Sequence, residues 1–478
     1  MKTYDVIVIG AGSAGLGCSG VANTIGLKTL LIEKRPHFFG GDCTNFGCIP
    51  SKALIHIANQ FHAAKKAASF GLESSGKADM KKVLGYIHEK QEHIRSEEDA
   101  EALRKQGIDV VIGEAKFEDK KVVRVLDETY TARLIFLCTG SSPRMLDIEG
   151  MEDIKVYTNE NIFFECKILP EHLVVIGGGS IGCELGQAFS RLGSNVTIVN
   201  RGERLLDKEP EHVSQILQEQ FEKESITVLN YAEVKRFKNE LAEIEITGAD
   251  DLNIPCDAAL LAIGRVVHTE GLRLSKAGIE LTEKDAIKTN SYLQTTNPAV
   301  YTIGDSANAY MFSHGAEKMV RMLWRNLLIP IFKKKNSMED LSWVTFTDPQ
   351  VAHFGLNEQQ LQEQKIDFYR QDQSLEVDDR AIIQEYTYGH QSLWMENGGN
   401  IRTRKLLSGS LIAPNAGELI QELELARHAD IPIGKINSRV YPYPVQSRIN
   451  QKTIRGVMEK TYTEFKKKLA RTAFRLWH

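Results

Sequence analysis

Two apolar runs in the chain each lead directly into a glycine-rich turn. The first run covers residues 4–9 and precedes Gly-Ala-Gly-Ser-Ala-Gly at 10–15. The second covers residues 172–176 and precedes Gly-Gly-Gly-Ser-Ile-Gly at 177–182. A short apolar run that ends in a turn with G-x-G-x-x-G spacing is typical of a buried parallel strand followed by a helix. The pattern therefore predicts two strand–turn–helix units in one chain.

Each glycine of such a turn has a physical task. The first makes the tight turn, the second lets the backbone approach a pyrophosphate, and the third allows the helix to pack closely on the strand. In the first copy a second strand, 29–32, ends in Glu33, 23 residues after Gly10. A carboxylate at this place can accept hydrogen bonds from ribose hydroxyls. Two such copies about 170 residues apart predict two dinucleotide-binding domains.

The second copy differs from the first at the acidic position. Its second strand, 195–199, ends in Asn200, again 23 residues after the first glycine, Gly177. Loss of the acid removes the ribose acceptor that favours NAD, while Arg201 and Arg204 could contact a 2′-phosphate. This pattern favours NADP over NAD, although the arginines could also belong to a solvated loop.

After Pro349 the pattern changes and no glycine fingerprint recurs. We expect strands at 381–388 and 408–412 and a helix over 417–428. This region reads as a separate α+β domain, for dimerisation rather than for a third nucleotide.

Length and composition agree with a soluble protein of about three domains. The chain has 478 residues, 42% of them hydrophobic and 26% charged, and a net charge of -4 that gives no reason to expect nucleic acid. Residues 4–9 follow Lys2 without the longer apolar stretch of a signal peptide. The best candidate for a membrane span, 319–332, contains two arginines and Pro330. We therefore expect a cytoplasmic protein.

Only one pair of the seven cysteines invites a chemical interpretation. Cys43 and Cys48 have four residues between them, with Gly47 and Pro50 shaping the start of a predicted helix. A helix N-terminus lowers the pKa of a thiol, because its free N–H groups stabilise the thiolate. The other five cysteines read as buried thiols that act as small hydrophobic residues.

The segment 43–52, C-x-N-x-G-C-x-P-S-K, resembles the redox-active motif of the flavoprotein disulfide reductases. This class of pyridine nucleotide disulfide oxidoreductases includes dihydrolipoamide dehydrogenase, glutathione reductase and mercuric reductase. Further landmarks match in order along nearly the whole chain; they lie at 137–143, 262–265, 301–305, 311–314 and 346–352.

The resemblance implies an α/β chain with two Rossmann-like dinucleotide-binding domains, for FAD and NAD(P), and a C-terminal α+β dimerisation domain. The expected boundaries are 1–150 with 266–340 for the FAD domain, 151–265 for the NAD(P) domain and 341–478 for the interface domain. A homodimer without nucleic acid, acting on a small molecule or a small disulfide, is implied as well.

The resemblance also implies the roles of site residues. Cys48 is expected to be the thiolate next to the flavin, and Cys43 the outer sulfur that meets the substrate. Lys52 and Glu184 are expected to pair near the flavin N5, where a cation stabilises the reduced, anionic flavin. The remaining residues expected to bind the cofactors are Gly10, Gly12, Ser13, Ala14, Gly15, Glu33, Lys34, Gly41, Asp42, Ala115, Thr139, Gly140, Gly304, Asp305, Met311, Phe312 and His314, with Gly177, Gly179, Ser180, Ile181, Gly182, Asn200, Arg201 and Gly264. No metal ligands are predicted.

Two departures from the family pattern affect the substrate side. Asp42 replaces the usual threonine, and an acid beside Cys43 should disfavour its thiolate. In disulfide-reducing members a His-Glu couple, in the block H-P-T-x-x-E, acts as acid and base; here Tyr443 and Arg448 take these places. A phenol with a pKa near 10 is a poor proton shuttle at neutral pH. We therefore expect slow exchange with dithiol substrates.

Three functions remain open at this point. The first is an NAD(P)H oxidoreductase that passes electrons through FAD and the Cys43–Cys48 disulfide to an unidentified acceptor. The second is a mercuric-reductase-like enzyme for a metal ion, a quinone or an oxidant; a tyrosine at 443 suits it, but the cysteines that end mercuric reductases are missing. The third is a redox sensor that retains flavin with little turnover.

The last segment, 460–478, mixes basic and large apolar side chains. A basic amphipathic helix of this kind can lie on an anionic membrane surface. The alternative, a terminal helix that packs on its own domain, is the interpretation that we prefer from the sequence.

Overall fold

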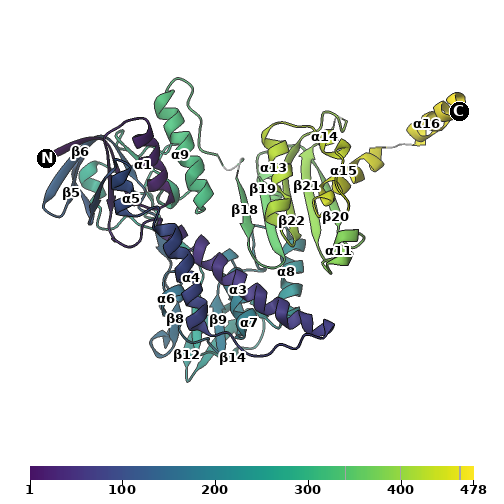
Figure 1. The fold of residues 1–478 in the computed structure, drawn as a ribbon, viewed down its shortest axis with the longest axis horizontal. Coiled ribbons are helices and arrows are strands. Elements are labelled where there is room, and N and C mark those ends of the chain that lie inside the picture. Colours follow the sequence, from purple (N-terminus) through teal and green to yellow (C-terminus); the bar gives the residue numbers. More distant parts are fainter. Residues whose placement is uncertain (338, 340, 399, 462–463) are drawn as a thin grey trace. The chain divides into compact units, whose positions relative to one another are not determined.

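The computed structural model describes residues 1–478 except Met338, Asp340, Gly399, Tyr462 and Thr463. It divides into two compact units, which are described one at a time (Figure 1). Unit 1 comprises residues 1–177, 185–199 and 232–337, and unit 2 the rest of the described chain. The expected boundary at residue 340 lies outside the described residues, and the division into three domains stays a prediction.

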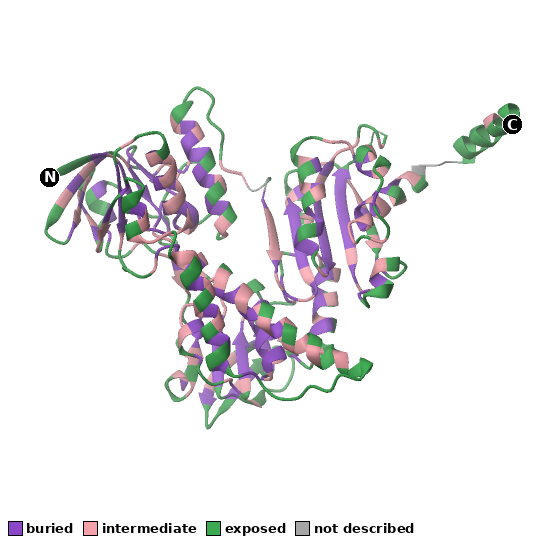
Figure 2. Ribbon diagram, in the orientation of Figure 1, coloured by how far each residue is buried: buried purple, intermediate pink, exposed green. Residues whose placement is uncertain are grey.

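The first predicted parallel unit is confirmed in unit 1. Its sheet has the strand order β3-β2-β1-β6-β5-β4, and β17 also pairs with β6. The pairs of β1 with β2 and β6 are parallel, whereas β5 pairs antiparallel with both β4 and β6. The bounds are β1 Lys2–Ile9, β2 Thr29–Glu33, β3 Asp109–Ile112, β4 Ala115–Asp119, β5 Val122–Val125, β6 Glu128–Leu137 and β17 Val300–Thr302. A run such as β1 is apolar on successive residues because a parallel sheet is covered on both faces (Figure 2).

Helix α1 covers this sheet, and α2 and α3 carry the cysteine motif. Helix α1 packs against α9, and Gly17 leaves room for the side chain of Val320. Helix α3 packs against α4, whose first turn is capped by the Asp79 carboxylate. The bounds are α1 Ser13–Thr24, α2 Gly41–Asn45, α3 Cys48–Lys66, η1 Ala67–Phe70, α4 Met80–Arg95, α5 Ala100–Lys105, η2 Met151–Asp153, α6 Ile162–Glu165, η3 Leu274–Ala277, η4 Gly304–Ala307 and α9 Ser313–Leu328.

The second predicted parallel unit is also present. Strands β10, β9, β15 and β8 form a parallel sheet in this order. Their bounds are β8 Lys155–Tyr157, β9 His172–Ile176, β10 Asn195–Asn200 and β15 Ala258–Leu261, and α7 covers Ser180–Leu192. Smaller sheets are formed by β12 Ala232–Lys238 with β13 Leu241–Ile246 and β14 Leu252–Pro255, and by β7 Ser141–Pro143 with β16 Arg265–Val267.

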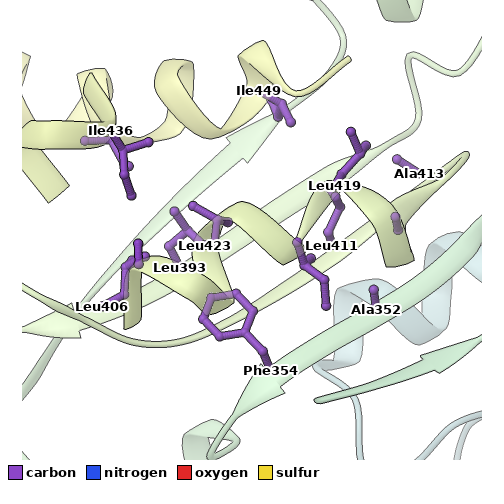
Figure 3. Packing of buried hydrophobic residues seen from close by; sticks show 14 of the residues in the cluster. Ala352, Phe354, Leu393, Leu406, Leu411, Ala413, Leu419, Leu423, Ile436 and Ile449 are labelled. Atoms are coloured by element: carbon purple, nitrogen blue, oxygen red, sulfur yellow. The ribbon is translucent and has the colours of Figure 1, made fainter. Parts of the chain in front are cut away.

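An antiparallel sheet in the order β18-β19-β22-β21-β20 forms the core of unit 2. Helices pack on one face of it around Phe354, Leu393, Leu411, Leu423 and Ile449 (Figure 3). The strands of this sheet are β18 Ser342–Thr345, β19 Gln350–Gly355, β20 Phe368–Ser374, β21 His390–Glu396 and β22 Leu406–Ala413. Strand β11 Thr227–Asn230 is not part of it and belongs to the sheet of β10. The helices are α8 Glu211–Lys223, α10 Glu358–Glu363, α11 Asp379–Ile383, α12 Ala416–Leu419, α13 Gln421–His428, α14 Ile433–Ser438, α15 Arg448–Thr461 and α16 Glu464–Trp477.

One strand predicted in this region is wrong. Residues 381–388 do not form a strand; their first part belongs to helix α11. The Asp378 carboxylate accepts hydrogen bonds from the backbone N–H groups of Arg380 and Ala381, which starts a helix where alternating apolar residues suggested a strand. The strand at 408–412 is confirmed within β22, and the helix at 417–428 is present as α12 and α13.

None of the helices in the described part of the chain is both long enough and apolar enough to cross a membrane.

Candidate functional site

The two cysteines lie on either side of a break between two helices. Cys43 belongs to α2 and Cys48 is the first residue of α3. Gly47 stands between the helices, where a β-carbon would lie 2.8 Å from the Asp42 carboxylate, so only glycine fits without a shift. Pro50 is in the first turn of α3, where its missing N–H costs no helical hydrogen bond.

Side chains from neighbouring elements hold this break in place. The Asn45 amide donates hydrogen bonds to the carbonyl oxygens of Phe39 and Gly41. The buried Gln91 amide of α4 donates to the carbonyl oxygens of Thr44 and Asn45. The separation of the two cysteines is therefore set by a hydrogen-bonded frame.

Cys48 lies in surroundings that favour its thiolate. Both sulfurs are free thiols in this structure, and the Cys43 thiol forms a hydrogen bond with Cys48. That bond lowers the pKa of Cys48 to about 6, with help from the Ser313 hydroxyl, 3.4 Å from the sulfur, and from the Lys52 cation. Partial enclosure of the sulfur and the charge of Asp42 oppose this effect. Cys48 is therefore mostly a thiolate at neutral pH.

Cys43 behaves in the opposite way. Its pKa is raised well above the usual value, first by the hydrogen bond with Cys48, then by burial and by the negative charge of Cys48. The Asp42 carboxylate raises it further, which confirms the expected effect of this acid. The pair therefore holds one proton, and that proton stays on Cys43.

The carboxylate of Asp42 is held by partners of its own. The Arg265 guanidinium donates to it at 2.9 Å and the Asn159 amide at 3.2 Å. Arg265 also donates to the hydroxyl and carbonyl oxygens of Ser141, at 2.7 and 2.9 Å, and is only 10% exposed. Arg265 thus connects the cysteine segment with the 139–143 turn, a role that its place in a sequence landmark did not reveal.

The other five cysteines are all buried, as predicted: Cys18, Cys138, Cys166, Cys183 and Cys256. Burial raises the pKa values of Cys138, Cys166, Cys183 and Cys256, which keeps these thiols protonated.

The first glycine turn has the shape that a bound pyrophosphate needs. A β-carbon at Gly10 would clash with the carbonyl oxygen of Cys138, and one at Gly15 with that of Gly10. At Gly41 it would lie 2.6 Å from the α-carbon of Gly12, so two glycine backbones meet at the start of α1. Ser13 and Ala14 begin that helix, whose free N–H groups attract anions. These residues fit the phosphates of FAD.

The acid that ends β2 is tied to the same turn. The Glu33 carboxylate accepts hydrogen bonds from the backbone N–H groups of Ala11, at 2.8 Å, and Arg35, at 3.0 Å. A carboxylate has about four acceptor sites, so it can still bind ribose hydroxyls. Lys34, next in the chain, pairs with Glu114 at 2.7 Å, beside the buried Ala115.

A second group of predicted residues gathers around Asp305, at the start of η4. The Ser141 hydroxyl donates to its carboxylate at 2.5 Å, and the Arg265 guanidinium lies 3.7 Å away. Burial raises the pKa of Asp305, against the effects of these two partners. Gly304 has a positive φ of 77°, and a β-carbon there would press on Ala14 at 3.0 Å. The structure therefore brings Asp305 close to the phosphate turn.

The other predicted contacts of the first domain lie nearby in sequence and structure. Thr139 and His268 exchange hydrogen bonds with each other's carbonyl oxygens, at 3.0 and 2.9 Å, beside Gly140. The rings of Phe312 and His314 stack at 5.3 Å, next to the partly exposed Met311. Ser313, which lies between these two residues in sequence, contacts Cys48 but was not predicted, because a serine at the start of a helix has no distinctive pattern.

The second glycine turn is built in the same way. Gly177 has a φ of 116°, and its β-carbon would clash with the carbonyl oxygen of Ala262. Gly264 likewise has a φ of 108°. Gly179 has open space around its α-carbon, and Ser180, Ile181 and Gly182 form the first turn of α7.

Asn200 supports the loop that follows β10. Its amide donates to the carbonyl oxygens of Gly202 and Arg204, and to the side chain of Asn230 at 2.8 Å. Arg201 is exposed on this loop, and Arg204 donates to the carbonyl oxygen of Asp207. Asn200, which stands where the first copy has Glu33, therefore stabilises this loop with its side chain.

Lys52 and Glu184 lie in different units, so their expected pairing stays a prediction. Lys52 is on α3, one turn after Cys48, and its charge reaches that sulfur. Glu184 is buried, and its carboxylate accepts a hydrogen bond from the backbone N–H of Phe346 at 2.9 Å.

The Tyr443 segment of unit 2 has a different chemical character. The Tyr443 side chain is 67% exposed, and the Arg448 guanidinium lies over its ring at 5.0 Å from the centroid. Tyr441 is buried and donates a hydrogen bond to Glu422 at 2.7 Å. The two residues that replace the His-Glu couple therefore contact each other.

One cluster in unit 2 was missed by sequence reasoning, because its members are far apart in the chain. Potential metal-ligating atoms of His212, Asp372 and His390 lie within 4.8 Å of one another. The Ser392 hydroxyl joins His212 to Asp372, and the Arg370 guanidinium lies 3.4 Å from His212 Nδ1 and 3.0 Å from the Asp372 carboxylate. The Arg370 guanidinium thus already places a positive charge beside these atoms. We therefore interpret the cluster as a structural link between α8 and the antiparallel sheet of unit 2.

The family model of the pyridine nucleotide-disulphide oxidoreductases matches residues 4–320, and that of their dimerisation domain matches residues 341–453. The chain belongs to the pyridine nucleotide-disulphide oxidoreductase family. This finding confirms the resemblance that the cysteine motif indicated.

Relatives with different activities are similar to the chain to nearly the same degree. A mercuric reductase from Staphylococcus aureus is 32% identical over 445 residues, which are 92% of this chain and 80% of the relative. A dihydrolipoyl dehydrogenase from Thermus scotoductus is 31% identical over 457 residues, 94% and 96% of the two chains. The Cu(II) complex of the HOCl-induced flavoprotein disulfide reductase RclA from Escherichia coli has a TM-score of 0.83, with 24% identity, over 96% of this chain and 100% of that one. The last comparison shows the fold.

Membership of this family agrees with the predicted cofactors. Its members are oxidoreductases that bind FAD and NAD(P)H and act on disulfide groups. The C-terminal dimerisation domain indicates a homodimer.

Proposed function

We propose that this protein uses NADPH to reduce a Cys43–Cys48 disulfide and passes the two electrons to an acceptor that does not depend on a histidine base. The observation that carries the proposal is the cysteine pair, in which one sulfur is poised as a thiolate and the other holds a proton. Bound FAD would carry the electrons between the nicotinamide and the disulfide.

In the first half of the proposed reaction, NADPH reduces the disulfide, and different residues of the chain serve different parts of this step. NADPH and one proton reduce the disulfide, and the products are NADP⁺ and two thiols, one of which ionises. Cys48 becomes the thiolate, stabilised by Cys43, Ser313 and Lys52. Gly10, Gly12 and Gly15 would hold the pyrophosphate of FAD, Glu33 its ribose and Asp305 its sugar-like chain. From the family resemblance we expect Lys52 and Glu184 to pair beside bound FAD.

The proton on Cys43 limits which electron acceptors the dithiol can reduce. A disulfide acceptor must be attacked by a thiolate, and the pKa of Cys43 is raised by Cys48, by burial and by Asp42. In the homodimer we expect Tyr443 of the second chain to meet Cys43, where family members have a histidine. A phenol removes this proton poorly at neutral pH, so lipoamide and glutathione disulfide should be slow acceptors.

A mercuric-reductase-like reaction is the second candidate, and Tyr443 favours it. A soft metal ion can bind sulfur directly, and its binding promotes release of the thiol proton. A quinone or another oxidant is reduced without attack by a Cys43 thiolate on a disulfide. A sensor with little turnover is the third candidate.

The second glycine turn supports NADPH as the donor. The Asn200 side chain donates its hydrogen bonds to the loop, and Arg201 is exposed beside it. A guanidinium there binds a 2′-phosphate, whereas the acid that would bind the 2′-hydroxyl of NADH is missing.

An anaerobic acceptor panel tests this function. Purified dimer is given NADPH or NADH, and then lipoamide, glutathione disulfide, Hg(II) or a soluble quinone. We expect oxidation of NADPH with Hg(II) or the quinone at least about 100-fold faster than with lipoamide. Fast lipoamide turnover would contradict the acceptor proposal. If none of the acceptors supports NADPH oxidation, the result would contradict the enzymatic proposal and favour the sensor.

A further inference from the structure

The last two helices of the chain differ in how they are buried. Helix α15 contributes Ile449, Ile454 and Val457 to the core of unit 2, and Ile449 is labelled in Figure 3. Helix α16 has no buried residue. Its large apolar side chains are between 61% and 82% exposed; they are Phe465, Leu469, Phe474, Leu476 and Trp477. The packing on its own domain that we preferred for residues 460–478 is therefore wrong for α16; Tyr462 and Thr463 lie outside the described residues.

Most of the apolar residues and most of the basic residues of α16 lie on different sides of the helix. At about 100° per residue, Phe465, Leu469 and Leu476 fall within roughly 40° of one another. Trp477 lies roughly 80° beyond Leu469, with Lys466 between them, and Phe474 lies roughly 140° beyond Leu469, next to the basic residues. The basic side chains Lys467, Lys468, Arg471 and Arg475 fall within roughly 100° on the other side. The helix is thus amphipathic, with Phe465 on its apolar side.

The charge of this segment is opposite to that of the remaining chain. Residues 464–478 contain five basic side chains and one acid, Glu464, a net charge of +4. Since the whole chain has a net charge of -4, the other residues have -8. Glu464 already pairs with Lys467 at 2.8 Å and lies 3.7 Å from Arg471. A positively charged amphipathic helix on an otherwise acidic protein fits a partner that has an anionic surface and an apolar interior.

We propose that α16 is an anchor that binds the surface of anionic lipid bilayers. A bilayer surface offers negative headgroups to the basic side and acyl chains to the apolar side, where tryptophan and phenylalanine are favoured. A nucleic acid would satisfy only the basic side, and the apolar side would stay in water. The helix has 14 residues, roughly 21 Å, which is too short for the ~30 Å of a bilayer core, so it would lie in the plane of the surface.

Co-sedimentation with vesicles tests the anchor independently of the proposed function. The full-length dimer is mixed with vesicles of phosphatidylcholine alone or with about 30% phosphatidylserine. We expect it to pellet with the anionic vesicles, and to be released at about 0.5 M salt because the Debye length shortens. A protein that lacks residues 464–478 should bind at least 10-fold less, on the order expected for loss of several basic contacts.

Two variants separate the contributions of the two sides. Phe465→Ser/Leu469→Ser/Trp477→Ser removes apolar contacts, and Lys467→Gln/Arg471→Gln/Arg475→Gln removes charge; each should weaken binding about as much as the deletion. Ile382→Ser/Ile383→Ser changes exposed apolar residues of α11 and should bind like the unchanged protein. NADPH oxidation should be the same in all of them, which excludes misfolding as the cause.

Three results would overturn the proposal. In the first, full-length protein stays in the supernatant with anionic vesicles. In the second, the protein binds vesicles equally well without residues 464–478. In the third, the deletion leaves vesicle binding unchanged but converts dimer to monomer in sedimentation velocity, which would make the apolar side an interface between copies of the chain.

Discussion

The Cys43–Cys48 region and the Tyr443 segment make a contrast within one molecule. Around Cys48, a thiol, a hydroxyl and a cation act together and bring the pKa of the sulfur to about 6. The stretch 441–448 holds neither histidine nor carboxylate in its sequence, and Arg448 covers Tyr443. The first region is equipped to receive electrons and control a proton, whereas the second lacks a group that titrates near neutral pH. On our proposal, the chain therefore keeps the reductive half of its family's reaction while the acceptor half has changed.

Loss of either sulfur should have the largest effect. Cys48→Ser and Cys43→Ser should each lower NADPH-dependent acceptor reduction by at least about 1000-fold, because one sulfur cannot form the disulfide. Steady-state assays with the best acceptor of the panel measure this. Cys256→Ala, at a buried cysteine outside the pair, is the control and should retain activity. Full activity of Cys43→Ser would remove the pair from the reaction.

Restoring the acid–base couple tests the contrast from the other side. Tyr443→His/Arg448→Glu should raise lipoamide turnover by about 100-fold near pH 7, since an imidazole can accept the Cys43 proton. Tyr443→Phe, which removes only the hydroxyl, should change it less than about 3-fold. An equal loss in both variants would show that the tyrosine itself serves the reaction.

The choice of nucleotide should respond less strongly. Arg201→Ala should lower the ratio of kcat/KM for NADPH to that for NADH by about 10-fold, through loss of a charged contact with the 2′-phosphate. Lys208→Ala, at another exposed cation of the loop, is the matched control. If the ratio stays the same in both, a different residue reads the phosphate.

The smallest effect concerns the titration of Cys48. The thiolate, and with it the rate of alkylation by iodoacetamide, is present above a pH of about 6 and is lost as the pH falls through that value. Ser313→Ala removes one hydrogen bond to the charged form and should move the inflection upward by about one pH unit. Lys52→Gln should move it in the same direction by less. An inflection that does not move in Ser313→Ala would exclude the hydroxyl from this role.

The parts that repeat a pattern are predictable from the sequence. Strands β1 and β9 end in continuously apolar residues and are followed by glycine turns, so both parallel units could be located, and the cysteine motif was found from its spacing. The contacts that set the pKa of Cys48 and hold the Asp42 carboxylate could not be predicted. Ser313 is 265 residues from Cys48 and Arg265 is 223 from Asp42, and only the fold brings them together. The error at 381–388 has a local cause, since the Asp378 cap decides between a helix and a strand.

The central claim is that NADPH converts a Cys43–Cys48 disulfide into two thiols. Five of the seven cysteines are buried, so N-ethylmaleimide applied to the native protein should report on this pair alone. Mass spectrometry of the oxidised protein should show no added label, and protein treated anaerobically with NADPH should carry two, at Cys43 and Cys48. An equal number of labels before and after NADPH would contradict the account.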